Sequence, residues 1–279
     1  MLLSIVIPVY NPAHLESKIE QFLVPQLESF RRNTTLAGIE LVYVCNGCTE
    51  KTREVLTEYK KSMPIKILWF DQGLGFTKAT NVGIKASVGE IVLMFNDDAV
   101  ILDYCPKDMW MRWLLSPFWD DAKIGMTGVH ELYCHHSQEN FFVGYCVACR
   151  RKMLEEIGLL DEIFSPGAGE DTDLCIRARL HGWKTKNVDP KMRSMIHSGE
   201  ALSGEFTYPI WHPGESTFHN WEHKGDYAVD SKWDRIFKRN SLILSDRRSM
   251  GYYSEKQPRI NTIPELTPIS LGLKELLSA

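Results

Sequence analysis

The sequence predicts an α/β domain whose mixed, mostly parallel sheet is flanked by helices, followed by a less regular C-terminal extension. Over the first hundred residues, short apolar, β-branched runs alternate with segments of helical periodicity. Alternation at this spacing is typical of a parallel sheet with right-handed crossovers. The pattern is mixed after residue 100, and from about Ser194 onward regularity fades.

Four strands and three helices are expected in the first half. The strands are 4–9, 41–44, 65–70 and 90–94, and the helices are 15–27, 50–59 and 76–86. The first helix has Leu15, Ile19, Phe22, Leu23 and Leu27 on one face, which is the spacing of an amphipathic helix.

Fewer elements are expected in the second half. A segment rich in Trp and Met, 108–119, is either an amphipathic helix or a surface facing a bound molecule. A strand is expected at 141–147, with helices at 150–157 and 174–181. The tail 257–279 has several prolines and then a short amphipathic stretch, 269–277. That stretch would pack back on the domain, mediate oligomerisation or touch a membrane surface.

Composition narrows the function. The 279 residues, 44% of them hydrophobic, suit one large domain, and the net charge of −4 argues against nucleic-acid binding. No apolar run reaches the length of a membrane span. The first residues lack the basic start and cleavage site of a signal peptide, so they are expected to form a strand. Seven cysteines, an odd set, favour a reducing cytoplasm.

Two other ligand classes are disfavoured. The pairs Cys45/Cys48 and Cys146/Cys149 lie about a hundred residues apart in the sequence, so convergence on one zinc ion is not expected. Pro8-Val9-Tyr10-Asn11-Pro12 follows the first strand, where a dinucleotide-binding domain has a glycine-rich turn. The sequence therefore excludes an NAD-dependent dehydrogenase.

An acidic motif, Asn96-Asp97-Asp98, closes an apolar strand. Open α/β sheets bind ligands at this edge, and carboxylate oxygens suit Mg²⁺ or Mn²⁺. Because side chains alternate along an extended segment, Asn96 and Asp98 should point one way and Asp97 the other. One carboxylate would then ligate a metal while its neighbour accepts hydrogen bonds from a ribose. An ordinary polar loop start is the alternative.

A second acidic group, Glu170, Asp171 and Asp173, opens a helix. Acids are favoured there by capping and by the helix dipole alone. The preceding Gly167-Ala168-Gly169 offers backbone freedom to present a carboxylate into a cleft. Such a carboxylate can deprotonate an attacking hydroxyl.

Five segments in order resemble the large inverting family of GT-A glycosyltransferases, family 2, which includes cellulose and chitin synthases and many bacterial rhamnosyltransferases. The segments are Ser4-Ile5-Val6-Ile7-Pro8-Val9-Tyr10-Asn11, Val44-Cys45-Asn46-Gly47-Cys48-Thr49-Glu50, Gly75-Phe76-Thr77-Lys78-Ala79-Thr80-Asn81-Val82-Gly83-Ile84, Phe95-Asn96-Asp97-Asp98 and Gly169-Glu170-Asp171-Thr172-Asp173-Leu174-Cys175-Ile176-Arg177. The resemblance covers about residues 1–200. It implies a GT-A domain there, with a nucleotide-binding half (1–100), an acceptor half (101–200) and an extension (201–279) that packs on it.

The resemblance also implies roles for single residues. Asp171, beside Glu170, is the expected general base, and Asp98 is the expected ligand of Mn²⁺ or Mg²⁺. His197 and His212 both fit a late His-x-Gly pattern whose histidine meets the metal or the diphosphate, with His197 the better match. The other expected contacts are with the nucleotide or donor sugar: Pro8, Val9, Tyr10 and Asn11 around the base, Asn46 on the base edge, Lys78, Asn81 and Asn96 nearby, and Asp97 at the ribose.

The implied reaction is transfer of a sugar from a nucleoside-diphosphate donor to a glycan or lipid-linked glycan. Cys45 and Cys48 stand where the family often has Asp and Ser, which leaves the donor base open. The acidic motif and the Gly-Phe helix favour the rhamnosyltransferase-like branch and a dTDP- or UDP-sugar. A cytoplasmic protein with peripheral membrane contact is expected.

Three questions stay open on the sequence alone. A nucleotidyltransferase shares the acidic sheet edge but usually has a basic, glycine-rich first loop. A catalytically silent nucleotide-sugar-binding scaffold would keep the fold without turnover. Finally, six tryptophans would either stack on an acceptor sugar or belong to the core: Trp110, Trp113, Trp119, Trp211, Trp221 and Trp233.

Overall fold

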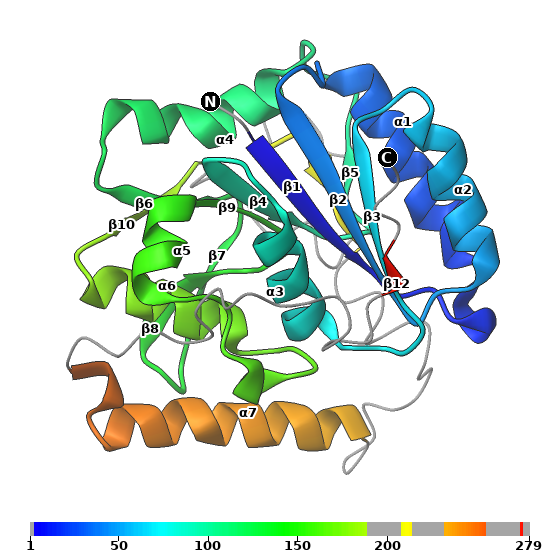
Figure 1. Cartoon of the computed structure of the whole chain (residues 1–279). Helices are drawn as coiled ribbons and strands as arrows, with labels where there is room; N and C mark the ends of the chain where they lie inside the picture. Colours follow the sequence, from blue (N-terminus) through cyan, green and yellow to red (C-terminus); the bar gives the residue numbers. More distant parts are fainter. Residues whose placement is uncertain (1–2, 189–207, 214–231, 255–273, 276–279) are drawn as a thin grey trace.

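The computed structural model describes residues 3–188, 208–213 and 232–254, together with the backbone of 274–275. Within these residues a central sheet has the strand order β10-β6-β9-β4-β1-β2-β3-β12 (Figure 1). The strands are β1 (Leu3–Val9), β2 (Ile39–Asn46), β3 (Ile65–Phe70), β4 (Ile91–Phe95), β6 (Ile124–Gly128), β9 (Cys146–Arg150), β10 (Lys184–Asn187) and β12 (Lys274–Glu275).

Most neighbours in this sheet are parallel. β1 pairs in parallel with β2 and β4, β2 with β3, and β6 with β10. β9 runs antiparallel to β4 and β6, and β12 runs antiparallel to β3. The predicted class, a mixed and mostly parallel sheet, is therefore confirmed. Two small antiparallel pairs stand apart, β5 (Val100–Ile101) with β11 (Ile210–Trp211) and β7 (Glu131–Cys134) with β8 (Glu139–Phe142).

Helices cover both faces of the sheet (Figure 1). They are α1 (Val24–Asn33), α2 (Glu50–Lys60), α3 (Phe76–Ala86), α4 (Met109–Asp120), α5 (Arg151–Ile157), α6 (Glu170–Leu180) and α7 (Lys232–Ser249). Side chains of β1 alternate between the two faces: Ile5 and Ile7 pack with α1, α2 and α4, and Val6 packs with the face of α3, α5 and α6. Burial on both faces is why these strands read as continuous apolar runs.

Several predicted elements match the structure and others do not. The helix 76–86 and the strand 65–70 have the predicted bounds. The single strand predicted at 141–147 is wrong, because the chain leaves the β-ladder between β8 and β9, at Val143–Tyr145. In that break the Val143 amide donates to the His130 carbonyl and the Asn96 amide donates to the Tyr145 carbonyl. Strands β6, β7 and β10 were not predicted.

The first helix is also more irregular than expected. A 3₁₀ turn (Ala13–Leu15) and a π-helical turn (Ile19–Leu23) come before α1, which begins at Val24. Pro25 lies in the first turn of α1, directly after the π-helical turn. The irregular turns bring Lys18 into the interior, with a side chain only 1% exposed.

The region expected to be irregular contains an 18-residue helix, α7. Its residues Phe237, Asn240, Leu244 and Arg247 recur at the spacing of one helix face, a signal that the sequence analysis did not use. The amphipathic stretch 269–277 lies outside the described residues apart from the backbone of 274–275, so its three alternatives stay predictions, as do the domain bounds.

Gly83 lies where α3 crosses the sheet, and it gives the first testable prediction. A Cβ there would stand 2.9 Å from Val44 Cγ2 and closer still to Val6. We expect Gly83→Ala to lower the free energy of unfolding by about 2 kcal/mol, because overpacking a tight contact costs about 1–3 kcal/mol. Urea denaturation measures it, with Lys78→Ala on the exposed side of α3 as the control. An unchanged midpoint for Gly83→Ala would contradict the close approach.

Candidate active site

A cleft of about 560 Å³ lies at the carboxyl ends of β1, β2 and β4 and extends to α6 and α7. From the predicted set it is lined by Pro8, Tyr10, Asn46, Asn96, Asp97, Asp98, Glu170, Asp171 and His212. From the second half it is lined also by the hairpin β7–β8 and by Phe237, Asn240, Ser241 and Leu244 of α7. Residues spread over more than two hundred positions thus meet at one edge of the sheet.

The side chains of the acidic motif divide into two sets of contacts, although Asp97 and Asp98 lie in a turn after β4 and not in an extended segment. Asn96 Nδ2 and Asp98 Oδ1 both approach His212 Nε2, at 3.2 and 3.1 Å. Asp97 turns the other way, and its Oδ2 is 3.9 Å from the Nζ of buried Lys18. Burial raises the pKa of Asp97 to about 6, against the opposing pull of the Lys18 ammonium. Lys18 is a site neighbour that sequence reasoning missed, because only the irregular turns before α1 bring it inside.

His212 is held from two sides. Its ring stacks on Tyr145, with centroids 4.4 Å apart and an interplanar angle of 13°. Its edge faces Asp98, so the imidazole is fixed against the acidic motif. Of the two histidines predicted to meet a metal, His212 therefore stands beside the expected ligand. His197, the better match in the sequence, lies outside the described residues.

The side chains around Asp98 fit a divalent cation whose remaining ligands come from a substrate. Asn96 Oδ1 is buried and has no hydrogen-bond partner in the described part of the chain. Asp98 and His212 add a carboxylate and an imidazole beside it. Among the described residues, no three His, Cys, Asp or Glu side chains gather as a complete metal site. A few protein ligands completed by phosphate oxygens are the usual arrangement for Mg²⁺ in nucleotide sites.

Asp171 lies at the first turn of α6 and faces the cleft. The backbone N–H of Thr172 donates to its Oδ1 at 2.7 Å, and the Thr172 hydroxyl lies 3.4 Å away. The Gly144 N–H, freed by the break between β8 and β9, also donates to this carboxylate. Burial raises the pKa of Asp171 to about 6, and these donors limit the rise. A carboxylate of this kind takes up a proton near neutral pH.

Glu170 is buried, 4% exposed, and its Oε2 has no partner within the described residues. Burial raises the pKa of Glu170 well above its ordinary value, and the nearby Asp171 adds to the effect. Glu170 is therefore a second buried acid beside Asp171. The structure brings both of these predicted residues to the cleft.

Backbone conformation explains why α6 can begin here. Ala168 and Gly169 have φ of 76° and 102°, so the chain turns sharply just before Glu170. Across the cleft, Gly75 has φ of 78°, and a Cβ there would stand 2.7 Å from Pro166. The turn before α3 and the loop before α6 therefore touch, which a larger residue at Gly75 would prevent.

Asn46 bridges three segments. Its Nδ2 donates to the Val9 carbonyl at 2.7 Å, and its Oδ1 accepts from the Leu74 amide at 2.9 Å. These bonds fix the ends of β1 and β2 against the turn after β3. The second N–H of the Asn46 side-chain amide remains for the predicted contact with a base edge. Two neighbouring predicted residues are also buried. Val9 is fully buried, and the side-chain amide of buried Asn11 has no hydrogen-bond partner in the described residues.

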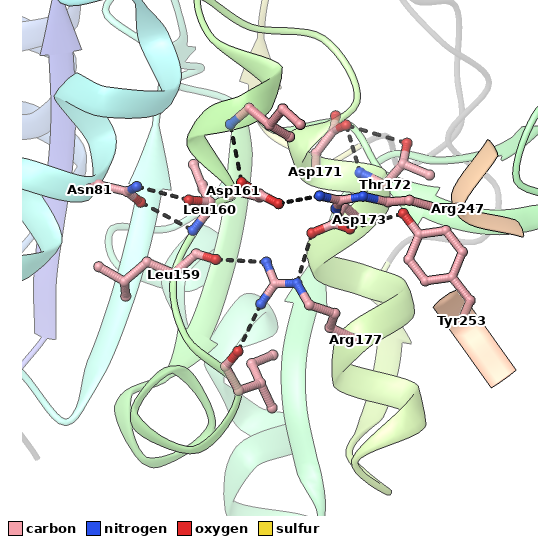
Figure 2. A network of polar contacts seen from close by, with 12 residues as sticks. Asn81, Leu159, Leu160, Asp161, Asp171, Thr172, Asp173, Arg177, Arg247 and Tyr253 are labelled. Atoms are coloured by element: carbon pink, nitrogen blue, oxygen red, sulfur yellow. Dashed lines mark hydrogen bonds and ion pairs between the residues drawn. The ribbon is translucent and has the colours of Figure 1, made fainter. Parts of the chain in front are cut away.

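Four of the predicted residues are absent from the lining of the cleft: Val9, Asn11, Lys78 and Asn81. The Asn81 amide is bonded to Leu160 on both sides, donating to its carbonyl at 2.8 Å and accepting from its N–H at 3.1 Å (Figure 2). The proximity of Asn81 to the nucleotide is corrected accordingly, because its amide joins α3 to the loop after α5. Lys78 is exposed on α3 and is not among the lining residues.

The tryptophans divide between core and surface. Trp110 is buried in an aromatic cluster with Phe30 and Phe95, so the core alternative holds for it. Trp119 is 61% exposed on α4, and Trp211 stacks on Phe22. None of these three lines the cleft. Trp221 and the side chain of Trp233 lie outside what the structure describes.

The sheet order, the acidic turn after β4 and the carboxylates at the start of α6 together define a GT-A-like α/β fold. Residues 4–117 match the family model described as "Glycosyl transferase family 2". The uncharacterized glycosyltransferase EpsJ of Bacillus subtilis is 30% identical over 112 residues, 40% of this chain and 29% of that protein. The uncharacterized glycosyltransferase alr2836 of Nostoc sp. is 32% identical over 101 residues, 36% and 29% of the respective lengths.

The chain thus spans 29% of the length of both relatives. Among solved structures, GalNAc-T7 with UDP, GalNAc and Mn²⁺ is similar with a TM-score of 0.56 and 14% identity, over 93% of this chain and 59% of that one. S. aureus TarS 1-349 is similar with a TM-score of 0.52 and 18% identity, over 68% and 59%. At these identities the structures support the fold. No helix in the described ranges is long and apolar enough to cross a membrane.

Proposed function

We propose that the protein is a metal-dependent, inverting glycosyltransferase that moves a sugar from a nucleoside-diphosphate donor to a hydroxyl of a glycan or glycoconjugate. One observation carries the proposal. Asp98 with His212 and Asp171 with Glu170 line the same cleft, at the sheet edge where open α/β folds bind nucleotides. The matches to glycosyltransferases support the same class.

In the proposed mechanism the two acidic groups have separate tasks. Asp171 accepts the proton of the acceptor hydroxyl as its oxygen attacks the anomeric carbon, and the bond to the diphosphate breaks on the opposite side. A single displacement of this kind inverts the anomeric configuration. Asp98 and His212 would hold Mg²⁺ or Mn²⁺, which supplies positive charge to the leaving diphosphate. Lys18 Nζ lies 3.9 Å from Asp97 Oδ2, and in this proposal Asp97 accepts hydrogen bonds from the ribose.

The donor is proposed to be a dTDP- or UDP-sugar, as in the rhamnosyltransferase-like branch. Cys45 is fully buried and Cys48 donates to the Val9 carbonyl at 3.3 Å, so neither thiol offers a charge at the base. In this proposal a pyrimidine edge is read by backbone groups around Pro8 and Tyr10, which line the cleft.

The first test is nucleotide binding. We expect UDP or dTDP to raise the melting temperature in the presence of Mn²⁺ and to do so less without it, since a ligand that binds only the folded state stabilises it. GDP and CDP serve as controls. Hydrolysis of the matching sugar nucleotide then separates an enzyme from a silent scaffold. If no nucleotide gives a metal-dependent shift, the proposal fails.

A variant of His212 tests the metal assignment. We expect His212→Ala to raise the Kd of the Mn²⁺–nucleotide complex by about 10-fold, since loss of a supporting group typically costs 10–100-fold in metal affinity. Titration calorimetry measures it. His14→Ala, on the exposed turn before α1, is the matched control. Equal metal dependence in both variants would remove His212 from the site.

A further inference from the structure

The loop Ile163–Gly169, here called the base loop, leads directly into Glu170 and Asp171. Its last two residues have positive φ, and its Pro166 packs against the turn before α3. Backbone polar groups outside helices and strands need other partners when they are buried. For the carbonyls of this loop, most of the hydrogen-bond donors come from α7, more than sixty residues later in the chain.

Asn240 of α7 is the central donor to the base loop. It is 1% exposed, and its single Nδ2 approaches the carbonyls of Phe164, Gly167 and Ala168 at 3.0, 2.9 and 2.8 Å. The neighbouring Arg239 donates to the carbonyls of Ile163 and Ser165 at 2.7 and 3.3 Å. Five of the seven carbonyls between 163 and 169 therefore face donors on α7.

Arg247, two turns further along α7, joins the two ends of the base loop. Its Nη2 is 2.5 Å from Asp161, just before the loop, and its Nη1 is 2.6 Å from Asp173, just after it (Figure 2). Asp173 is fully buried and also binds Arg177 at 2.7 Å and the Tyr253 hydroxyl at 2.9 Å. The ion pairs with Asp173 and Asp161 raise the pKa of Arg247 despite its burial. A charge-paired arginine of this kind fixes geometry through its planar fork.

From these contacts we infer that α7 contributes to catalysis by fixing the base loop. Its residues Asn240 and Arg247 are positioning residues that hold Asp171 in place for proton transfer. The inference rests on the proposed function of Asp171. It extends that function to a helix outside the segment that matches the family model, residues 4–117. The same helix turns Phe237, Ser241 and Leu244 into the cleft beside the base loop. Helix α7 therefore also lines the part of the cleft beside the base loop.

The test compares Asn240→Ala with Lys238→Ala in the full chain. Lys238 lies on the same helix, but its side chain is exposed and pairs with Asp234 of that helix. Hydrolysis of UDP-glucose and dTDP-glucose with Mn²⁺ is measured well below the melting temperature, together with the Kd of UDP and dTDP. We expect Asn240→Ala to lower kcat about 10- to 100-fold with an unchanged KM for the donor, because small misplacement of reacting groups costs about 10²-fold. Lys238→Ala should keep the kcat of the parent chain.

Arg247 gives a graded version of the same test. Arg247→Ala is expected to lower kcat at least as much as Asn240→Ala, and Arg247→Lys to recover part of it. The lysine keeps the charge but reaches only one carboxylate well. If α7 only stabilises the fold, the melting temperature falls in these variants while kcat at low temperature and KM stay those of the parent. That result would overturn the inference.

Failure of the inference is distinguishable from failure of the proposed function. If Asp171→Asn abolishes hydrolysis while Asn240→Ala and Arg247→Ala do not change kcat, the base assignment stands and the positioning role is wrong. If the parent chain neither binds nor hydrolyses any sugar nucleotide, the proposed function has failed. Hydrogen exchange of residues 163–172 then tests the remaining structural statement, that Asn240 protects the base loop.

Discussion

Asp171→Asn should lower sugar transfer by about 10²- to 10⁴-fold, the range that general base catalysis contributes. The variant keeps the shape of the side chain and an oxygen that accepts from Thr172, but it cannot take up a proton. Binding of UDP or dTDP with Mn²⁺ should be unchanged, because the proposed metal ligands Asp98 and His212 are both kept in this variant. Near-normal turnover in this variant would remove Asp171 from the base role.

The pH dependence follows from the same residue. The pKa of Asp171 is raised to about 6 by burial, and a base works only when it is deprotonated. The rate at saturating donor should therefore rise with pH and reach half its plateau near pH 6. A plateau that already extends down to pH 4.5 would contradict this assignment.

The linked effect on stability has the opposite sign from that of a salt-bridged aspartate. Because folding raises this pKa, the ionised carboxylate costs stability above pH 6, and the cost disappears below the unfolded value of about 4. At pH 7.5 the free energy of unfolding of Asp171→Asn should therefore exceed that of the parent by about 3 kcal/mol, since the pKa shift from about 4 to about 6 is two units of about 1.4 kcal/mol each. The difference should shrink towards pH 4. Thermal denaturation at the two pH values separates this effect from general damage.

The local apolar pattern was enough to predict the elements whose boundaries depend on residues close by in the sequence. The strand 65–70 is apolar apart from Lys66, and 91–95 is apolar throughout, so both could be predicted from sequence, the second one residue early at 90–94. Strand β9 could not, because its break from β8 depends on tertiary hydrogen bonds at Val143 and Tyr145. Helix α7 was missed because its inward face is polar at Asn240 and Arg247, which satisfy groups far away in the sequence.

The candidate site shows the same division. Motif spacing predicted that Asp98 and Asp171 share a cleft, because strand ends and helix starts lie at the same edge of an α/β sheet. It did not distinguish amides that face a ligand from amides that join loops. Asn46 and Asn81 both have their amides bonded to backbone groups, whereas Asn96 keeps an oxygen without a partner in the described residues. Only the packed structure gives that difference.

Asp98→Ala should abolish the metal dependence of nucleotide binding. Asp98 is the buried carboxylate that faces His212 at 3.1 Å, and its side chain is 4% exposed. With few protein ligands available, loss of one should raise the Kd of UDP or dTDP in Mn²⁺ by about 100-fold, the upper end of the range for a group that supports a metal. The Kd would then approach that measured in EDTA. The weak, metal-free binding should persist, since it depends on the turn around Pro8 and Tyr10.

Two matched variants make this result specific to the metal. Glu90→Ala removes an exposed carboxylate just before β4, the strand that leads to Asp98, and should leave the Mn²⁺ titration unchanged. Asp171→Asn removes the other acid of the cleft and should lose turnover with the metal response intact. If Asp98→Ala responds to Mn²⁺ as the parent does, the ion is held elsewhere in the chain. If Asp98→Ala and Asp171→Asn both lose the metal response, the two acidic groups form one site, and the separation of tasks between leaving-group stabilisation and proton transfer is wrong.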